Sequence, residues 1–292
     1  MMTRLQTQND GFIFENLLSG SGKLLLHATL LGIGIVYLFP FFWMIGSALK
    51  TDREFFQLGI DPLPGGDYQW GNFAQAWEQA NFSQYFLNTV FYSVSTTLLV
   101  VLLTSMAAFA MCRLRIPGYK IILGMLALTF FMPQGYTIIP IFQIVRDIGL
   151  LNTVWAVVLV STAGGMVVNT LLFFGYFRSI PHEIEEAAII DGATVLQRYW
   201  QIVLPMSRPI IATVSLFTFM NTWNDFFTPL VFTLSRPELR TLSVGMFNFV
   251  GQSSREWTLM CAGATISIIP VILVFIVLQR YFIEAFAGAV KS

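Results

Sequence analysis

Charged side chains are scarce in this sequence, at 11% of its residues, whereas soluble domains carry about 25%. Lys plus Arg equals Asp plus Glu, at 16 each, so no overall charge favours a nucleic acid as partner. Hydrophobic residues, by contrast, reach 55% of the chain. This balance excludes an ordinary soluble domain and indicates a protein that is surrounded by membrane lipid.

Residues that commonly carry catalysis or bind metals are also few. The two histidines, His27 and His182, have no neighbouring Cys, His or acidic residue at metal-ligand spacing. The two cysteines, Cys112 and Cys261, lie at the ends of apolar runs and are expected on opposite sides of a membrane, too far apart for a disulfide. We therefore expect no catalytic residue, no metal site and no cofactor bound by this chain.

A nucleotide-binding loop is missing as well. The stretch SGSGK, from Ser19 to Lys23, looks like a P-loop, but that motif requires Gly where Leu17 stands and Ser or Thr where Leu24 stands. The stretch also leads into an apolar run and does not join a strand to a soluble helix. Any ATP that drives this protein is expected to bind to another polypeptide.

What the sequence does contain is long apolar runs. About 20 helical residues cross a hydrocarbon core, and six runs reach that length: residues 24–48, 88–111, 121–145, 152–176, 209–233 and 258–278. The first run is too long for the apolar part of a signal peptide and is expected to remain as a span. We therefore predict an all-α integral membrane protein with six transmembrane helices and both termini on one side.

The basic residues predict which side that is. Ten of the 16 Lys and Arg residues lie in loops on the side of the termini, and six lie in the loops opposite. Cytoplasmic loops carry an excess of positive side chains. Both termini are therefore expected in the cytoplasm.

One predicted cytoplasmic loop is acidic, rich in alanine and interrupted by glycine: EEAAIIDGATVLQRYWQIVLP, Glu185 to Pro205. A short helix is expected at its start, where Ser179 can cap the first turn and Pro181 is tolerated in it. Gly192 can end this helix in a left-handed conformation.

A second helix is expected directly after the glycine. Thr194 and Gln197 have the spacing of a capping box, and this helix should run to Val203 and stop at Pro205. The loop is therefore predicted to form a helix-turn-helix elbow outside the bilayer. Its small side chains, Ala187 and Ala188, would let a partner surface approach closely.

The loop resembles the EAA loop of permease subunits of bacterial ABC importers, whose pattern is EAA-x3-G-x9-I-x-LP. Glu186-Ala187-Ala188, Gly192 and Ile202-Val203-Leu204-Pro205 match every position of that pattern. The stretches CRLRIPGYK, Trp223-Asn224-Asp225-Phe226 and QRYFIEAFAGAVKS resemble the carbohydrate-importer branch, that of the maltose-type permeases. The resemblance covers the chain closely from Asn88 onward and the first span more loosely.

Several properties are implied by this resemblance. In the family, the EAA loop is a coupling helix that docks in a cleft of a cytoplasmic ATPase subunit, which implies docking residues Glu186, Ala187, Ala188, Asp191, Gly192, Ile202, Leu204 and Pro205. The implied partners are two copies of that ATPase, which hold ATP and Mg, a second permease that is homologous but different, and an extracytoplasmic solute-binding protein. The implied location is the bacterial inner membrane.

Polar residues at membrane depth are candidates for a solute path. In the fifth run, Asn221, Asn224 and Asp225 fall on one helix face together with Thr218 and Thr228. An acid inside a span costs a few kcal/mol, so Asp225 should face a watery cavity or a hydrogen-bond partner. Planar amides and aromatic rings suit sugars, and the predicted path residues are Gln134, Tyr136, Asn169, Asn221, Trp223, Asn224 and Asp225.

Packing is the alternative interpretation of these residues. Polar side chains also form hydrogen bonds between helices inside membranes. The polar face of the fifth run could make such a contact with another helix. Pro133 and Pro140 could kink the third run or open it next to the path. For Gly164 and Gly165 we favour close helix packing. The sequence alone does not distinguish between lining of a solute path and packing between helices.

The chain is expected to form a single transmembrane domain, residues 1–292. Residues 1–85 hold an N-terminal cytoplasmic segment, the first span and an extracytoplasmic loop, whose aromatic residues could lie in the membrane interface or contact the binding protein. Residues 86–285 form the permease core. Residues 286–292 form a cytoplasmic tail, expected to be extended and to touch the ATPase.

We interpret the chain as the permease subunit of an ATP-driven importer for a carbohydrate, with a neutral oligosaccharide as the default solute. A non-sugar or acidic-sugar solute is one alternative, and no Lys or Arg lies deep in the six runs to bind an acidic one. An ion-coupled secondary transporter is another, although no inverted repeat is visible. A membrane scaffold without transport is disfavoured by the polar stripe.

Overall fold

The computed structural model describes residues 20–57, 59–79, 81–114, 116–132, 137–249 and 256–290. Within these ranges, the regular structure consists of helices. Four helices are long and apolar enough to cross a membrane: α2 (Gly20–Ala48), α5 (Phe82–Cys112), α8 (Val154–Ser179) and α15 (Trp257–Val290). The predicted all-α class is therefore confirmed.

Two of the expected spans are broken. The third is divided into α6 (Tyr119–Leu128), η1 (Thr129–Phe131) and α7 (Ile138–Asp147), and the fifth into α12 (Arg208–Asn224) and α13 (Phe227–Phe232). Among the described residues, four continuous spans result, or five if the bent pair Val195–Met206 and Arg208–Asn224 counts as one. The six expected spans are therefore not all continuous helices, because backbone breaks interrupt the third and the fifth run. Pro133, a candidate for a kink in the third run, lies outside the described residues.

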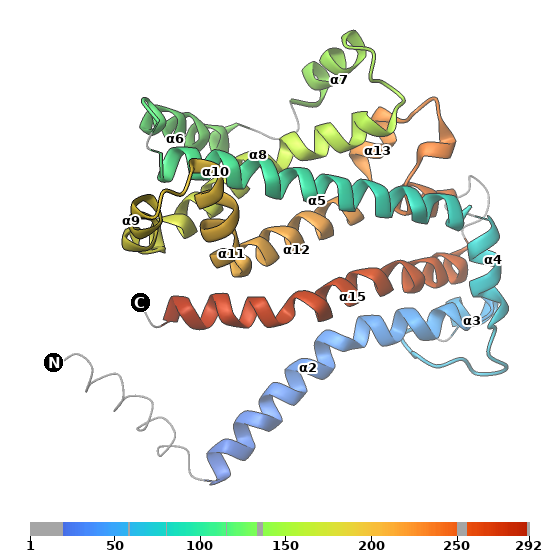
Figure 1. Ribbon diagram of the computed structural model, residues 1–292. Coiled ribbons are helices and arrows are strands. Elements are labelled where there is room, and N and C mark those ends of the chain that lie inside the picture. Colours follow the sequence, from blue (N-terminus) through green and yellow to red (C-terminus); the bar gives the residue numbers. More distant parts are fainter. Residues whose placement is uncertain are drawn as a thin grey trace.

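The long helices form one bundle. Figure 1 shows α5, α8 and α12 beside one another, with α15 next to α12. The C-terminal half of α2, which ends at Ala48, lies against α15. The start of α2 and the end of α15 point toward the end of the bundle that also carries α9 (His182–Ile190). The helices α3 (Asp52–Gln57) and α4 (Gly71–Gln79) lie at the opposite end. The start of α2 and the end of α15 therefore lie at the same end of the bundle as the elbow.

Short helices close the end of the bundle opposite α9. These are η4 (Pro237–Leu239), α14 (Leu242–Met246) and η5 (Phe247–Phe249). Asn88 holds them to the start of α5, because its Nδ2 donates to the carbonyl oxygens of Glu238 and Arg240 at 2.7 and 2.9 Å. The Tyr92 hydroxyl adds a bond of 2.9 Å to the Leu239 carbonyl oxygen. A polar residue near the start of an apolar run therefore fixes a loop about 150 residues away in sequence.

Three groups of buried apolar side chains hold the bundle together. One surrounds Phe82 and Trp223, where α4, α5, α12 and α15 meet. A second joins α5, α8 and the elbow through Phe109, Phe177 and Tyr199, and a third joins α5 to α8 and α13. Phe82 is fully buried, so the expectation that it lies in the membrane interface or on a partner is wrong for this ring.

The two neighbouring glycines of α8, Gly164 and Gly165, differ in how closely other helices approach them. A Cβ on Gly165 would lie 3.4 Å from a methyl carbon of Val100 on α5, so this glycine allows the two helices to pack closely. A Cβ on Gly164 would meet nothing within 4 Å. The packing interpretation therefore applies to Gly165 only.

Trp223 lies in the core of the bundle. Its side chain is 3% exposed, its Nε1 donates to the Ser267 carbonyl oxygen at 3.0 Å, and its ring stacks on Phe219 at 5.4 Å between centroids. Truncation of a buried Trp to Ala typically costs about 3–5 kcal/mol. We expect Trp223→Ala to lower the thermal unfolding temperature of the purified protein strongly. Trp70→Ala, at a ring that is 67% exposed, should leave it nearly unchanged.

The C-terminal tail differs from its expectation. The backbone of α15 stays helical to Val290, so the part of the tail up to Val290 is not extended. Alanine is the strongest helix former, and Ala285, Ala287 and Ala289 favour continuation of the last span. Lys291 and Ser292 lie outside the described residues.

Candidate functional site: a helical elbow and a polar pocket

The first arm of the elbow is α9, and Gly192 ends it. Gly192 has a φ of 82°, its N–H donates to Ile189 O at 3.0 Å, and the Ala193 N–H donates to Ala188 O at 2.9 Å. These two bonds form the Schellman arrangement in which a left-handed glycine satisfies the last carbonyls of a helix. The predicted glycine stop is confirmed.

The start of α9 was predicted incorrectly. Ser179 is the last residue of α8, and its hydroxyl donates to the Tyr176 carbonyl oxygen at 2.7 Å, so it does not cap α9. A residue before proline avoids the helical region, and Ile180 is extended, with ψ 128°. The helix α9 therefore begins two residues later than expected, at His182, with Pro181 directly before it.

The second arm begins with the predicted capping box. The Gln197 N–H donates to the Thr194 hydroxyl at 3.3 Å, and the Thr194 N–H donates to Gln197 Oε1 at 2.7 Å. The arm comprises α10 (Val195–Gln197), a π-helical turn (Arg198–Val203) and α11 (Leu204–Met206). Pro205 lies inside α11 and does not stop the arm, which meets α12 at 77° after Ser207. Proline is tolerated there because it occupies the first turn of α11.

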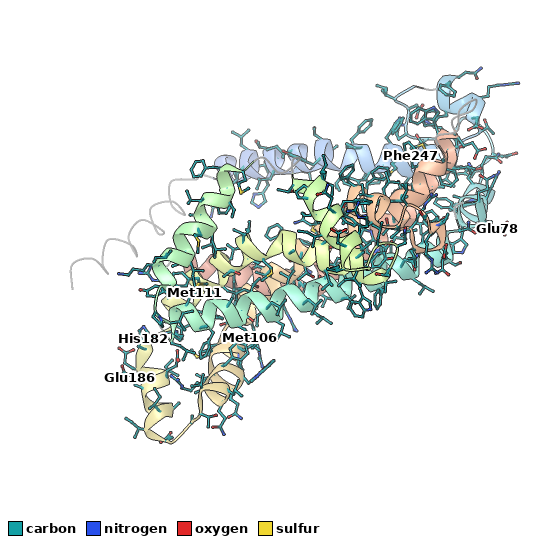
Figure 2. All side chains as sticks on the ribbon, turned by 90° about the horizontal axis from the view of Figure 1, so that it is seen from above. Glu78, Met106, Met111, His182, Glu186 and Phe247 are labelled. Atoms are coloured by element: carbon teal, nitrogen blue, oxygen red, sulfur yellow. The ribbon has the colours of Figure 1, made fainter. Side chains whose placement is uncertain are left out.

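The elbow projects from the end of the bundle. Figure 2 shows His182 and Glu186 on the part that extends beyond the end of α5. Glu186, Ala187, Asp191, Gly192 and Pro205 are exposed, whereas Ala188, Ile202 and Leu204 are half-buried. The expected docking residues therefore comprise five exposed and three half-buried residues.

An ionic cluster beneath the elbow was missed by sequence reasoning. Arg113 Nε lies 2.9 Å from Glu185 Oε1, and Arg198 Nη1 lies 3.6 Å from Glu185 Oε2. The Arg113 and Glu185 side chains are 1% and 5% exposed. No sequence pattern indicates this pairing, because Arg113 lies about 70 residues from Glu185, in a loop where it is one of several basic residues.

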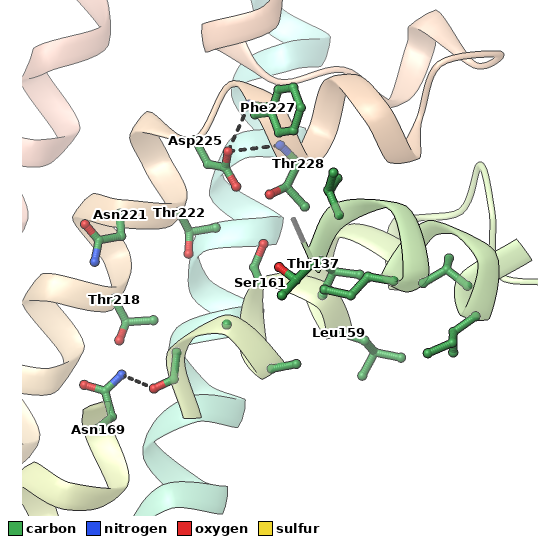
Figure 3. A pocket seen from close by; sticks show the side chains of 18 residues that line it. Thr137, Leu159, Ser161, Asn169, Thr218, Asn221, Thr222, Asp225, Phe227 and Thr228 are labelled. Atoms are coloured by element: carbon green, nitrogen blue, oxygen red, sulfur yellow. Dashed lines mark hydrogen bonds between the residues drawn. The ribbon is translucent and has the colours of Figure 1, made fainter. Parts of the chain in front are cut away.

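A pocket of about 840 Å³ lies between α8 and α12, with α7 and α13 at its rim (Figure 3). Asn169, Asn221 and Asp225, three of the predicted path residues, all line it. Hydroxyls supply the other polar lining, from Thr137, Ser161, Thr218, Thr222 and Thr228. The structure therefore brings polar side chains from three expected spans together around a space large enough for a small solute.

Two of these hydroxyls are buried without a partner among the described residues. Ser161 Oγ and Thr218 Oγ1 are both shielded and make no hydrogen bond there. A buried polar group without a bond costs free energy, so such atoms usually meet water or a ligand. Both residues line the pocket, but their oxygens are shielded, so either side chain would have to rotate before it could bond to an occupant.

Asp225 lies where α12 breaks into α13. Its Oδ1 accepts the backbone N–H groups of Phe227 and Thr228 at 3.0 and 3.1 Å (Figure 3). Such bonds stabilise the carboxylate and satisfy the first donors of the new helix. The acid therefore both shapes the break and lines the pocket, so the two sequence interpretations are not exclusive.

The remaining path residues lie elsewhere. Trp223 packs in the core, and the Asn224 amide donates to the Met220 carbonyl oxygen of its own helix at 2.8 Å, outside the pocket lining. Gln134 and Tyr136 lie outside the described residues. Ser161, Thr137 and Thr222 were missed, because single hydroxyls in apolar helices commonly bond to their own backbone and give no functional signal.

A bundle of membrane-spanning helices with a polar pocket between them and an exposed elbow at one end defines a membrane transport subunit. The family model described as "Binding-protein-dependent transport system inner membrane component" matches residues 85–287, and the chain belongs to this family. The family consists of inner-membrane transport components that act with an ATPase and a solute-binding protein, and they are not enzymes. This agrees with the interpretation of the sequence.

Named relatives are similar along most of their length. The melibiose/raffinose/stachyose import permease protein MelC of Bacillus subtilis is 31% identical over 89% of this chain and 94% of its own. The diacetylchitobiose uptake system permease protein NgcG of Streptomyces coelicolor is 32% identical over 87% of this chain and 84% of its own. Among solved structures, a bacterial ABC transporter involved in the import of the acidic polysaccharide alginate matches with a TM-score of 0.76 and 27% identity, over 91% of this chain and 99% of the other.

Proposed function

We propose that this chain is the permease subunit of an importer for a neutral oligosaccharide. The pocket carries the argument, because its polar lining consists of hydroxyls and amides, and Asp225 is the one ionisable residue that lines it among the described residues. The neutral hydroxyls of a sugar can form hydrogen bonds with such groups and need no oppositely charged partner. The relatives that import melibiose, raffinose and stachyose, or diacetylchitobiose, support a carbohydrate of this kind.

An acidic solute is the second candidate, because the structural relative imports alginate. Carboxylates are usually bound by Arg or Lys, and neither lines the pocket in the described part of the chain. Asp225 would in addition repel an anion. For an acidic solute, the cationic contacts would have to come from the second permease or from the binding protein.

The assembly is part of the same proposal. A second, homologous but different permease completes the path, and two copies of the ATPase bind ATP and Mg below the membrane. The exposed residues of the elbow tip dock on the ATPase, with Glu186, Ala187 and Gly192 at the contact. Both termini lie in the cytoplasm, residues 86–285 form the permease core, and the tail from residue 286 reaches toward the ATPase.

Competition between solutes tests the solute class. Uptake by the reconstituted complex should be inhibited by neutral oligosaccharides at lower concentrations than by uronate oligosaccharides of the same length. Asp225→Asn should narrow this difference, because it removes the negative charge that disfavours anions. Equal inhibition by both classes in the wild-type complex would refute neutral selectivity.

A further inference from the structure

The ionic cluster of Arg113, Glu185 and Arg198, here named the elbow clamp, lies on the inner face of the elbow. All three side chains are shielded from solvent, at 1%, 5% and 12% exposure. They come from three segments: the residue that follows α5, the first turn of α9, and the start of the π-helical turn. One carboxylate therefore joins both arms of the elbow to the end of a membrane span.

Arg113 also binds the end of α8. Its Nη2 donates to the carbonyl oxygens of Phe177 and Ile180, the latter at 2.8 Å. Its Nη1 lies 3.0 Å from the His182 ring at the start of α9. A single guanidinium thus contacts α8, the connection between α8 and α9, and α9 itself. Lysine could not reproduce this, because only the planar fork of Arg presents several donors in fixed directions.

The charges of the clamp are balanced by its surroundings. Two cations face one carboxylate, and the excess positive charge lies at the C-terminal end of α8, where the helix dipole is negative. A buried ion pair contributes little net stability compared with apolar side chains, but loss of one partner is costly. Such a cluster is therefore better suited to fixing one geometry than to stabilising the fold.

Neighbouring glutamates on α9 point in different directions. Glu185 is buried in the clamp, whereas Glu186 is exposed on the elbow tip. The second arm has its own anchor, because the Tyr199 hydroxyl lies 2.8 Å from the Ser105 hydroxyl of α5. The clamp is a polar connection between α9 and the ends of α5 and α8.

We propose that the elbow clamp couples the ATPase to the membrane helices. It makes α9 move as one body with the ends of α5 and α8, so that a displacement of the docked elbow tip reaches the helices of the pocket. Arg113 and Glu185 are positioning residues in this inference, which rests on the proposed import function. Without the clamp, the ATPase still docks and hydrolyses ATP, but its motion is absorbed at the connection between α8 and α9.

Three variants test the proposal in the complete complex, with the ATPase, the second permease and the binding protein. Glu185→Gln removes the charge that holds both arginines, and Arg113→Lys keeps the charge but loses the fork. Glu183→Gln is the matched control, because Glu183 is an exposed acid on the same helix. The measurements are co-purification of the ATPase, solute transported per ATP hydrolysed, and amide hydrogen exchange of residues 181–192 and of α5.

Loss of a buried ionic partner has large effects, so we expect transport per ATP to fall by about tenfold in Glu185→Gln and by less in Arg113→Lys. Co-purification of the ATPase should persist, and exchange should rise in α9 but not in α5. The control should match the wild type. Unchanged transport per ATP in Glu185→Gln would overturn the proposal, and so would loss of ATPase binding in proportion to uptake, since the clamp would then only shape the docking surface. If the wild-type complex itself shows no ATP-dependent uptake, the proposed function fails first.

Discussion

Uptake should fall by about tenfold when Gly192 is replaced with Val, while membrane insertion stays normal. Gly192 has a φ of 82°, and an L-residue in that conformation costs about 1–2 kcal/mol, with β-branched residues the least tolerant. A Cβ at this position meets no atom within 4 Å, so backbone conformation and not a clash is the cause. A fraction of molecules with a misdirected second arm lowers the apparent affinity for the ATPase. Uptake and ATPase co-purification measure the effect.

Gly192→Asn is the matched control for this prediction. Asn tolerates the left-handed region better than other side chains that carry a Cβ, and open space surrounds the position. Uptake in Gly192→Asn should therefore stay much closer to the wild type than in Gly192→Val. If both variants lose uptake equally, the bulk of the side chain at the docking contact is responsible, and the conformational explanation is wrong.

Uptake should also fall by several-fold in Asn221→Leu, without a comparable loss of assembled complex. Asn221 lines the pocket, and one hydrogen bond to a bound solute contributes about 0.5–1.5 kcal/mol. Leu adds apolar bulk to the lining but no charge, so insertion of α12 is not impaired. The measurement is solute uptake per assembled complex, together with the thermal unfolding temperature.

Asn224→Leu tests whether the pocket lining of the structure or the helical periodicity of the sequence identifies the path residues correctly. The pattern places Asn221 and Asn224 on one face, whereas the structure places only Asn221 in the pocket lining. Asn224→Leu should therefore affect uptake less than Asn221→Leu. A larger loss in Asn224→Leu, or a collapse of stability in Asn221→Leu at constant uptake per folded molecule, would favour the packing interpretation.

The elbow was predictable from the sequence because its signals are local. A glycine stop and a capping box each act within a few residues, and both are present as expected. Ser179 and Pro205 were the errors. The restraint that Pro181 places on Ile180 outweighs the capping preference of serine, and Pro205 is accommodated in the first turn of α11. The elbow clamp could not be found in this way, since its partners are joined only by the packing of α5 against α8.

The pocket was predictable in part. Helical periodicity places Asn221 and Asp225 on one face, and Asn169 was selected as a planar amide. Periodicity also placed Asn224 on this face, and Trp223 was selected as an aromatic ring that suits a sugar. The break at Asp225 and the packing of the indole against α15 put both residues elsewhere. Apolar runs predict where helices cross a membrane but do not show where their backbone breaks, and for this reason two expected spans appear as separate helices.

Uptake of a labelled neutral oligosaccharide into proteoliposomes tests the central claim most directly. The vesicles would contain this permease, its partner permease and the ATPase, with the solute-loaded binding protein outside and ATP and Mg inside. The account predicts accumulation that requires ATP, the ATPase and the binding protein together. Accumulation that persists without ATP or without the ATPase, or that follows an imposed ion gradient, would contradict it.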